Sequence, residues 1–261
     1  MEWLWSQWPP VAAEIVSSSH TVLLLDYDST LTWFASCSEQ ATLPVSTREV
    51  LQELAGHPRL TVAVISGRRL DDLRRLVRVR NLIYIGHYGL EIWHDGRQVK
   101  MNAPPPFQEA VTRIRSQLTN LVAEIPGALV EDKGLSISLH YRLVPHELAP
   151  HLVGVFVRDI LPVARLSGLT VLHGKNVIEL RPQLNRTKGH AALWVMQHSR
   201  RRSALPIYIG NDRTDEDAFR ALAEGITIRV GALDGSEAHY YVRDVKEVMA
   251  LLQWMAATCS T

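Results

Sequence analysis

The segment TVLLLDYDSTLT, residues 21–32, restricts the possible folds of this chain more than any other. Its first residues, 21–25, are apolar or β-branched, as in a strand that is buried on both faces of a parallel sheet. Asp26 and Asp28 follow at once, and in an extended chain their side chains point the same way. Because open α/β sheets bind ligands at the carboxyl ends of their strands, the segment predicts a pair of aspartates at a ligand-binding edge.

Paired carboxylates at a strand end suit phosphoryl transfer. Asp26 is the candidate nucleophile toward phosphorus, and Asp28 is its candidate acid and base. Ser29 and Thr30 add hydroxyls and backbone amides. The alternative is an ordinary turn, since Asp and Ser are common turn residues. Paired aspartates directly after so apolar a strand favour the catalytic interpretation.

Apolar strands alternate with helical patterns in two parts of the chain, up to about residue 92 and again after Pro182. This alternation is typical of a doubly wound α/β fold with a parallel sheet. Further strands are predicted at 60–65, 82–85, 207–209 and 226–230, and helices at 46–56, 70–79, 188–198, 215–224 and 245–254. We therefore predict a catalytic core formed by residues 1–104 and 185–261.

The prolines at 104–106 interrupt the alternation. Three consecutive prolines should not sit inside an element, so we interpret them as a stiff connector at a domain boundary. After them, the stretch 135–142 alternates apolar and polar residues, with Ser136, Ser138, His140 and Arg142 on the polar face. A strand with one buried face and one solvent-exposed face predicts an antiparallel sheet. With helices at 107–124 and 145–159 and strands at 128–132, 169–173 and 176–181, residues 105–184 read as an α+β insertion.

Polar residues follow other predicted strands as well. Ser66 comes after the strand 60–65, followed by Gly67 and Arg68, and its hydroxyl suits a phosphate oxygen. Asn211, Asp212 and Asp215 follow the strand 207–209. These groups should converge with Asp26 and Asp28 at one edge. Clustered oxygen ligands favour a hard cation, and Mg²⁺ binds through carboxylates and substrate phosphate.

Two helix starts bear on this site. Lys188 begins a predicted helix, where its positive charge opposes the helix dipole unless a bound phosphate attracts both. The alternative is an ordinary surface lysine. Asp215 is equally consistent with support of a metal ligand and with a favourable acid in a first helical turn. Thr214 and Asp217 resemble a capping box.

Composition excludes several classes of protein. The chain has 261 residues, 46% hydrophobic and 21% charged, with a net charge of +1, so we expect a soluble protein with no nucleic-acid partner. Its two cysteines lie far apart, which fits a reducing compartment. No signal peptide or membrane span is recognisable, and the start MEWLWSQWPP is interpreted as a capping segment. We expect a cytoplasmic monomer that acts on a small molecule.

The motifs resemble those of the haloacid dehalogenase (HAD) superfamily and, more closely, of trehalose-6-phosphate phosphatases. The resemblance rests on LLLDYDSTLT (23–32), ISGRRLDDL (65–73), VEDKGLSISLHYR (130–142), GKNVIELRP (174–182), TKGHAAL (187–193) and GNDRTDEDAF (210–219). It implies a Rossmann-like HAD core at 1–104 and 185–261, interrupted by a cap domain for substrate specificity at 105–184.

The resemblance also implies roles for single residues. Asp26 would form an aspartyl-phosphate, and Asp28 would protonate the departing sugar oxygen and later activate water. Mg²⁺ would be held by the Asp26 carboxylate, the Asp28 carbonyl and Asn211, with Asp212 or Asp215 close by. Phosphate oxygens would bind Ser66 and Lys188, beside Gly67 and Arg68. In the cap, the sugar hydroxyls would bind Glu131, Lys133, Arg142, Lys175 and Glu179; the alternative for these is a solvated sheet face.

The sequence departs from the family pattern at three places. Asn211 stands where Asp is usual, Ser29 where Gly is usual, and His87-Tyr88 where Asn-His is usual. The predicted activity is Mg²⁺-dependent hydrolysis of trehalose 6-phosphate to trehalose and phosphate. The alternatives are a phosphatase for another glucoside phosphate, such as glucosylglycerol phosphate or sucrose phosphate, and a catalytically silent sugar-phosphate sensor.

Overall fold

The computed structural model describes residues 1–33, 42–100, 105–132, 136–174, 176–182, 187–199 and 203–259. The chain divides into two compact units, the first formed by Met1–Lys100 with Arg186–Thr261 and the second by Met101–Asn185. Within the described residues, no helix combines the length and the apolar character needed to cross a membrane.

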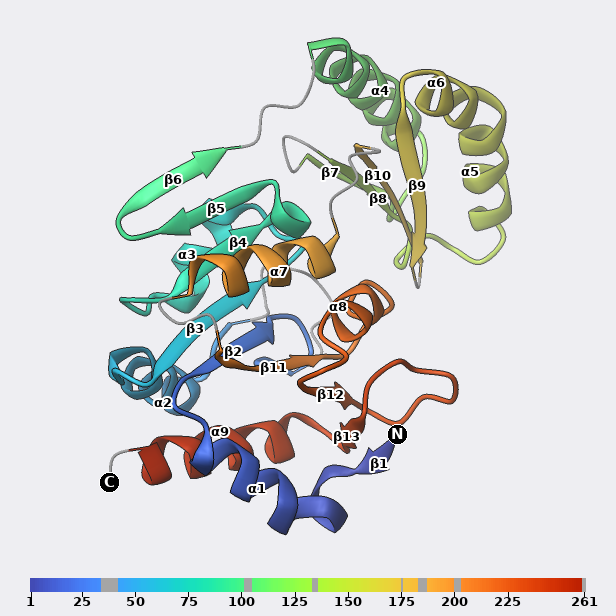
Figure 1. Cartoon of the computed structure of the whole chain (residues 1–261). Coiled ribbons are helices and arrows are strands. Elements are labelled where there is room, and N and C mark those ends of the chain that lie inside the picture. Colours follow the sequence, from blue (N-terminus) through green and yellow to red (C-terminus); the bar gives the residue numbers. More distant parts are fainter. Residues whose placement is uncertain are drawn as a thin grey trace. The chain divides into compact units, whose positions relative to one another are not determined.

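The first unit is built on a sheet that has nine strands in the described part of the chain, in the order β1-β13-β12-β11-β2-β3-β4-β5-β6 (Figure 1). Neighbouring strands from β1 to β4 are parallel, and β4, β5 and β6 are antiparallel. The strands are β1 (Glu2–Trp3), β2 (Thr21–Asp26), β3 (Leu60–Ile65), β4 (Ile83–Gly86), β5 (Glu91–His94), β6 (Arg97–Lys100), β11 (Leu205–Gly210), β12 (Ile226–Val230) and β13 (Tyr240–Val242). The predicted α/β class with a parallel central sheet is confirmed.

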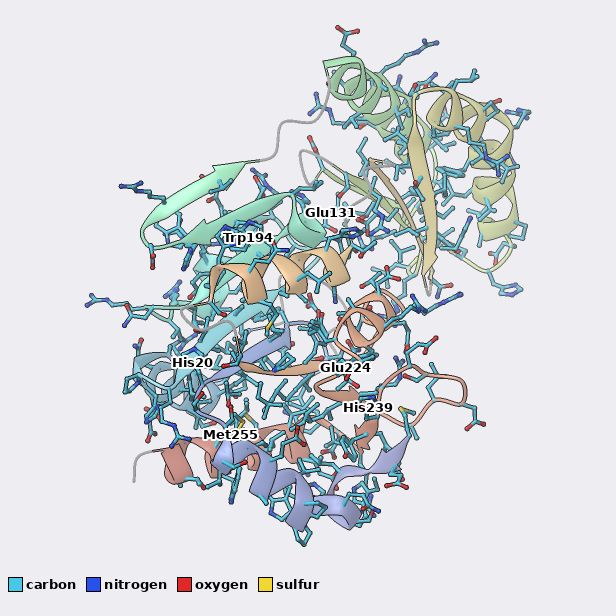
Figure 2. The ribbon with its side chains drawn as sticks, viewed as in Figure 1. His20, Glu131, Trp194, Glu224, His239 and Met255 are labelled. Carbon is cyan, nitrogen blue, oxygen red and sulfur yellow. The ribbon has the colours of Figure 1, made fainter. Side chains whose placement is uncertain are left out.

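Helices cover both faces of this sheet. Alternate residues of β2 point to opposite sides, so each face presents apolar side chains that the helices bury. Leu23 and Leu25 share a hydrophobic cluster with residues of α1, α2, α3 and α9, whereas Val22 and Leu24 share one with α7 and α8. In Figure 2, Trp194 marks α7 and the fully buried Met255 marks α9. The helices are η1 (Leu4–Gln7), α1 (Trp8–Ser17), α2 (Val45–Gly56), α3 (Leu70–Val77), η3 (His87–Gly89), α7 (Lys188–His198), α8 (Glu216–Ala221) and α9 (Val245–Cys259).

The N-terminal segment is more regular than its composition suggests. β1 pairs in parallel with β13 and forms an edge of the sheet. Pro9 and Pro10 lie in the first turn of α1, where a missing N–H costs no helical hydrogen bond. The segment interpreted as a cap therefore supplies an edge strand and the start of a helix.

The second unit is organised around an antiparallel four-stranded sheet, in the order β7-β8-β10-β9. Its strands and helices are β7 (Leu129–Asp132), β8 (Ile137–His140), β9 (Leu169–Gly174), β10 (Val177–Pro182), α4 (Pro105–Ala123), α5 (Ala149–Val155), the π-helix η4 (Phe156–Ile160) and α6 (Leu161–Leu166). Ile114, Leu139 and Phe156 belong to its own hydrophobic core. The predicted small antiparallel sheet is confirmed.

Three local predictions in this unit are wrong. α4 begins at Pro105, because prolines are tolerated in a first helical turn, where the backbone N–H has no intrahelical partner. The helix predicted at 145–159 begins at Ala149 and continues through a π-turn into α6. Ser136 and Ser138, predicted on a wet face, are buried.

Candidate active site

The carboxyl ends of β2, β3 and β11 bring polar residues together. Asp26 pairs with Ile65 in the sheet register, so Ser66 follows directly beside it. Leu25 pairs with Ile209, which places Gly210 and Asn211 on the other side. These are the strand ends at which α/β folds bind ligands. The predicted clusters at 26, 66 and 211 therefore share one edge of the sheet.

Lys188 joins this edge from the first turn of α7. Its Nζ lies 2.6 Å from Oδ1 of Asp26, 2.8 Å from Oδ1 of Asp215 and 3.8 Å from Oδ1 of Asp212. The side chain is only 1% exposed. Asp26 also accepts a hydrogen bond from the Thr30 hydroxyl (3.1 Å). The structure thus makes Lys188 a buried partner of the candidate nucleophile rather than a surface lysine.

Charge is unevenly balanced around Lys188. Burial disfavours its charged form, but Asp212, Asp215 and Asp26 outweigh this and hold the pKa of Lys188 well above its usual value. Burial raises the pKa of the Asp26 carboxyl well above its usual range, against the opposing effect of Lys188 and with the help of Asp215 and Asp212. One ammonium therefore faces three carboxyl groups, and this excess of acids favours a bound cation.

Asp215 is the most completely bonded of these acids. Its Oδ1 accepts hydrogen bonds from Lys188 Nζ and from the Tyr208 hydroxyl (2.8 Å each), and its Oδ2 accepts from the amides of Asn211 and Asp212 (2.9 Å each). A Cβ at Gly210 would lie 2.3 Å from Asp215 Cγ, so only glycine fits there. Because these bonds use the acceptor sites of both oxygens, Asp215 orients the turn at 211–212 better than it would bind a metal directly.

The turn after β11 differs from the predicted capping box. Oδ1 of Asp212 accepts hydrogen bonds from the Thr214 amide and hydroxyl (2.6 Å each) and from the Asp215 amide (3.1 Å). Thr214 thus bonds backward to Asp212, and α8 begins at Glu216 without a side-chain cap. The capping-box prediction is wrong because Asp212 is the stronger acceptor for the Thr214 hydroxyl.

Arg229 holds this turn from β12. Its Nη2 donates to the carbonyl of Asn211 (2.6 Å), and its Nη1 donates to the carbonyl of Asp212 (3.3 Å) and to Glu216 Oε1 (2.7 Å). Sequence analysis missed this residue, although a lone arginine inside the apolar strand 226–230 was a usable signal. It also missed Tyr208, since a tyrosine in a buried strand is more often core than a carboxylate partner.

Asp28 has a different environment from Asp26. β2 ends at Asp26, and Asp28 lies in the turn that follows the strand. The Asp28 carboxylate receives a bidentate hydrogen bond from Arg68, with Nη2 2.6 Å from Oδ1 and Nε 2.8 Å from Oδ2. The Asp28 side chain is 46% exposed. Arg68 thus orients the candidate acid and base.

The loop after β3 packs against His87 and Tyr88. The Tyr88 amide donates to the Ser66 carbonyl (3.1 Å), and the His87 amide donates to the Arg68 carbonyl (2.8 Å). A Cβ at Gly67 would lie 2.5 Å from the Tyr88 ring. Gly67 therefore makes room for the Tyr88 ring.

The candidate sugar-binding residues lie in the second unit. Glu131 on β7 (Figure 2) and Glu179 on β10 are both register partners of Ser138 on β8. The Glu131 carboxylate lies 2.8 Å from His140 Nε2, and Arg142 follows the end of β8. Lys133 and Lys175 lie outside the described residues. The structure thus brings Glu131 and Glu179 to one row of the sheet.

The residues predicted to hold a divalent cation, at 26, 28, 211 and 212, offer only oxygen donors, which is the ligand type that hard cations take. Among the described residues, no group of three or more His, Cys, Asp and Glu side chains has the arrangement of a metal site. The available donors also include backbone and amide oxygens, however, and hard cations such as Mg²⁺ take oxygen ligands of all these kinds.

A family model, a curated relative and a solved structure identify the same family. Residues 24–246 match the family model described as trehalose-phosphatase. The chain is 30% identical over 271 residues to a trehalose 6-phosphate phosphatase of Zea mays, covering 96% of this chain and 73% of that protein. A crystal structure of a trehalose-6-phosphate phosphatase related protein superposes with a TM-score of 0.78 at 26% identity, covering 91% of this chain and 97% of that one.

Another relative is much longer. The chain is 34% identical over 224 residues to an uncharacterized glycosyl hydrolase of Mycobacterium tuberculosis, a match that covers 82% of this chain but 16% of that protein. The chain thus spans about a sixth of the length of this relative.

Proposed function

Because this chain belongs to the trehalose-phosphatase family of the haloacid dehalogenase superfamily, we propose that it is a Mg²⁺-dependent phosphatase that hydrolyses trehalose 6-phosphate to trehalose and phosphate. The observation that best supports the proposal is the buried contact between Asp26 and Lys188 (2.6 Å) at the strand end next to Ser66. This arrangement offers a nucleophilic carboxylate and a cation for phosphate oxygens at one place.

In the proposed reaction, a carboxylate oxygen of Asp26 attacks phosphorus, and the bond from phosphorus to the sugar oxygen breaks. Asp28 reacts in its protonated form and gives its proton to that oxygen as the sugar leaves, and the resulting carboxylate accepts the two hydrogen bonds from Arg68. A water molecule then attacks phosphorus of the aspartyl-phosphate and loses its proton to Asp28, which releases phosphate and restores Asp26. Lys188 and Ser66 hold the phosphate oxygens throughout, and Arg68 keeps Asp28 in place.

Mg²⁺ would be held by the Asp26 carboxylate, the Asp28 carbonyl, the Asn211 side chain and Asp212. When bound, the cation neutralises charge on the transferred phosphoryl group. Asp215 and Arg229 act on this set indirectly, because they fix the amides and carbonyls of the turn at 211–212. Asn211 brings an amide where the family usually has a carboxylate, so we expect weaker Mg²⁺ affinity than in relatives that have Asp there.

The second unit, in this proposal, is the cap that selects the sugar. Glu131, Lys133, Arg142, Lys175 and Glu179 would contact sugar hydroxyls. A phosphatase for glucosylglycerol phosphate or sucrose phosphate would use the same chemistry with different hydroxyl contacts, so substrate choice has to be measured.

Phosphate release tests the proposal directly. Trehalose 6-phosphate, sucrose 6-phosphate, glucosylglycerol phosphate and glucose 6-phosphate are compared with Mg²⁺ and with EDTA. We expect the highest kcat/KM for trehalose 6-phosphate, loss of activity in EDTA, and a decrease of roughly 10³-fold or more in Asp26→Asn. Asp234→Asn, a change of the same kind at an exposed loop position, should keep full activity.

Each other outcome has a defined meaning. A higher kcat/KM for a different glucoside phosphate would replace the substrate assignment while leaving the chemistry intact. Absence of phosphate release from every substrate, with sugar-phosphate binding retained, would instead identify a silent sensor.

A further inference from the structure

A basic cavity of about 470 Å³ lies in the first unit. Its lining includes Arg74, Arg78, Arg80, Tyr84 and Trp93, which come from α3, the loop that follows it, β4 and β5. The loop enters β4 at the amino end of that strand, whereas Ser66 follows the carboxyl end of the parallel neighbour β3. The cavity is therefore at the opposite edge of the sheet from the candidate active site, and the proposed phosphatase reaction makes no use of it.

The arginines of this cavity lack the partners that other arginines in this chain have. Arg75, next to Arg74 on α3, pairs with Asp72 at 2.8 Å. Within the described residues, no carboxylate forms an ion pair with Arg74, Arg78 or Arg80. The Arg74 guanidinium lies over the Trp93 ring, 3.5 Å from its centroid. Three arginines thus line this concave site, and none of the described residues that line it is acidic.

A structural role at the end of α3 accounts for only part of this charge. Basic residues are favourable at a helix C-terminus, where they compensate free carbonyls. Here Arg48 of α2 already donates to the carbonyls of Val77 (2.9 Å) and Leu76 (3.3 Å). Arg78 Nε bonds the Arg75 carbonyl (2.7 Å), which leaves its terminal nitrogens available.

The wall of the cavity is held in a fixed shape. The Tyr84 hydroxyl donates to the Val79 carbonyl (2.5 Å) and accepts from the Val79 amide (2.9 Å), so it anchors the loop between α3 and β4 from both sides. Tyr84 is also the register partner of Trp93 on β5. Such anchoring lowers the entropy cost of binding, because the site needs little reordering.

We propose that this cavity binds a small anion with several phosphate charges. Guanidinium groups match phosphate oxygens in a bidentate manner, and three arginines line this cavity. The volume falls within the range of small-molecule sites, which is roughly 300–1,000 Å³. The arginines, rather than the Trp93 ring face, provide the recognition, since Arg74 covers that face.

Calorimetric titration with inorganic tripolyphosphate in EDTA buffer tests the site. Arg78→Gln/Arg80→Gln should weaken binding by about tenfold or more, because each hydrogen bond to a charged group contributes substantially to the binding free energy. The control Arg158→Gln/Arg165→Gln removes the same charge from exposed positions of the second unit and should bind like the wild type. Ser66→Ala, which alters the candidate active site, should also leave this affinity unchanged.

Three results would overturn the proposal. They are wild-type affinity in Arg78→Gln/Arg80→Gln, equal weakening in both charge-removing variants, and weakening in Ser66→Ala alone, which would place the probe in the active site. Arg78 and Arg80 are exposed, so far-UV circular dichroism should confirm that the variant folds. Arg78→Lys/Arg80→Lys keeps the charge and should bind more tightly than the Gln variant.

Discussion

At the scale of single residues, Lys188 links folding to the proposed chemistry. Its ammonium is buried and contacts the carboxylates of Asp26 and Asp215. Lys188→Met would leave these acids buried without their cation, and breaking a buried pair in this way costs roughly 3–5 kcal/mol. We expect the free energy of unfolding in EDTA, measured by urea titration, to decrease by about this amount.

The matched control is Arg220→Met. Arg220 pairs with Asp217 at 3.3 Å and is 59% exposed, so its removal should change the free energy of unfolding by less than about 1 kcal/mol. If Lys188→Met lowers the free energy of unfolding by no more than this control, the buried network contributes little to stability. The role of Lys188 would then be limited to binding phosphate.

The position of a site residue in the sequence pattern decides whether it could be predicted. Asp26, Ser66 and Asn211 lie at or just after the ends of apolar strands, and a strand-end rule finds them. Lys188 starts a predicted helix, where its charge is unfavourable without a bound anion. Tyr208 lies inside β11, where its hydroxyl role depends on Asp215 being folded back beneath it. Residues inside strands become site residues only through tertiary contacts, which local patterns do not encode.

At the scale of elements, the packing of α7 against α8 sets the position of Lys188. A Cβ at Gly189 would lie 2.5 Å from the backbone carbonyl oxygen of Asp217 in α8. Backbone cannot move as a flexible side chain does, so Gly189→Ala must push the helices apart. We expect a loss of roughly 1–3 kcal/mol in the free energy of unfolding and a lower kcat in the phosphate-release assay.

Gly154 in α5 provides the opposite case. Nothing lies within 4 Å of a Cβ built there, so Gly154→Ala should gain roughly 0.5–1 kcal/mol from helix propensity. A similar change in the free energy of unfolding for both variants would show that α7 and α8 can move apart without loss of stability.

Long elements were predictable and short ones were not. β2, β3 and α7 have continuous apolar runs or clear helix starts, and their positions were predicted closely. β13 and the β5–β6 pair are three or four residues long and exist because a neighbouring strand supplies hydrogen-bond partners. The predicted start of α4 was wrong because a proline run breaks the interior of a helix but is tolerated in its first turn.

At the scale of the whole molecule, each unit has its own hydrophobic core. Leu139 and Phe156 belong to the core of the second unit, whereas Leu24 and Phe219 belong to a cluster of the first. All seven tryptophans of the sequence lie within residues 1–100 and 186–261. Tryptophan fluorescence therefore reports unfolding of the first unit, while far-UV circular dichroism reports both.

This distribution makes independent unfolding of the units measurable. Phe156 and Phe219 are both fully buried, and truncating either to alanine should cost roughly 3–5 kcal/mol. Phe156→Ala should move part of the circular dichroism transition to lower urea and leave the fluorescence midpoint unchanged. Phe219→Ala should lower the fluorescence midpoint. If both variants shift both signals equally, the two units unfold as one cooperative system.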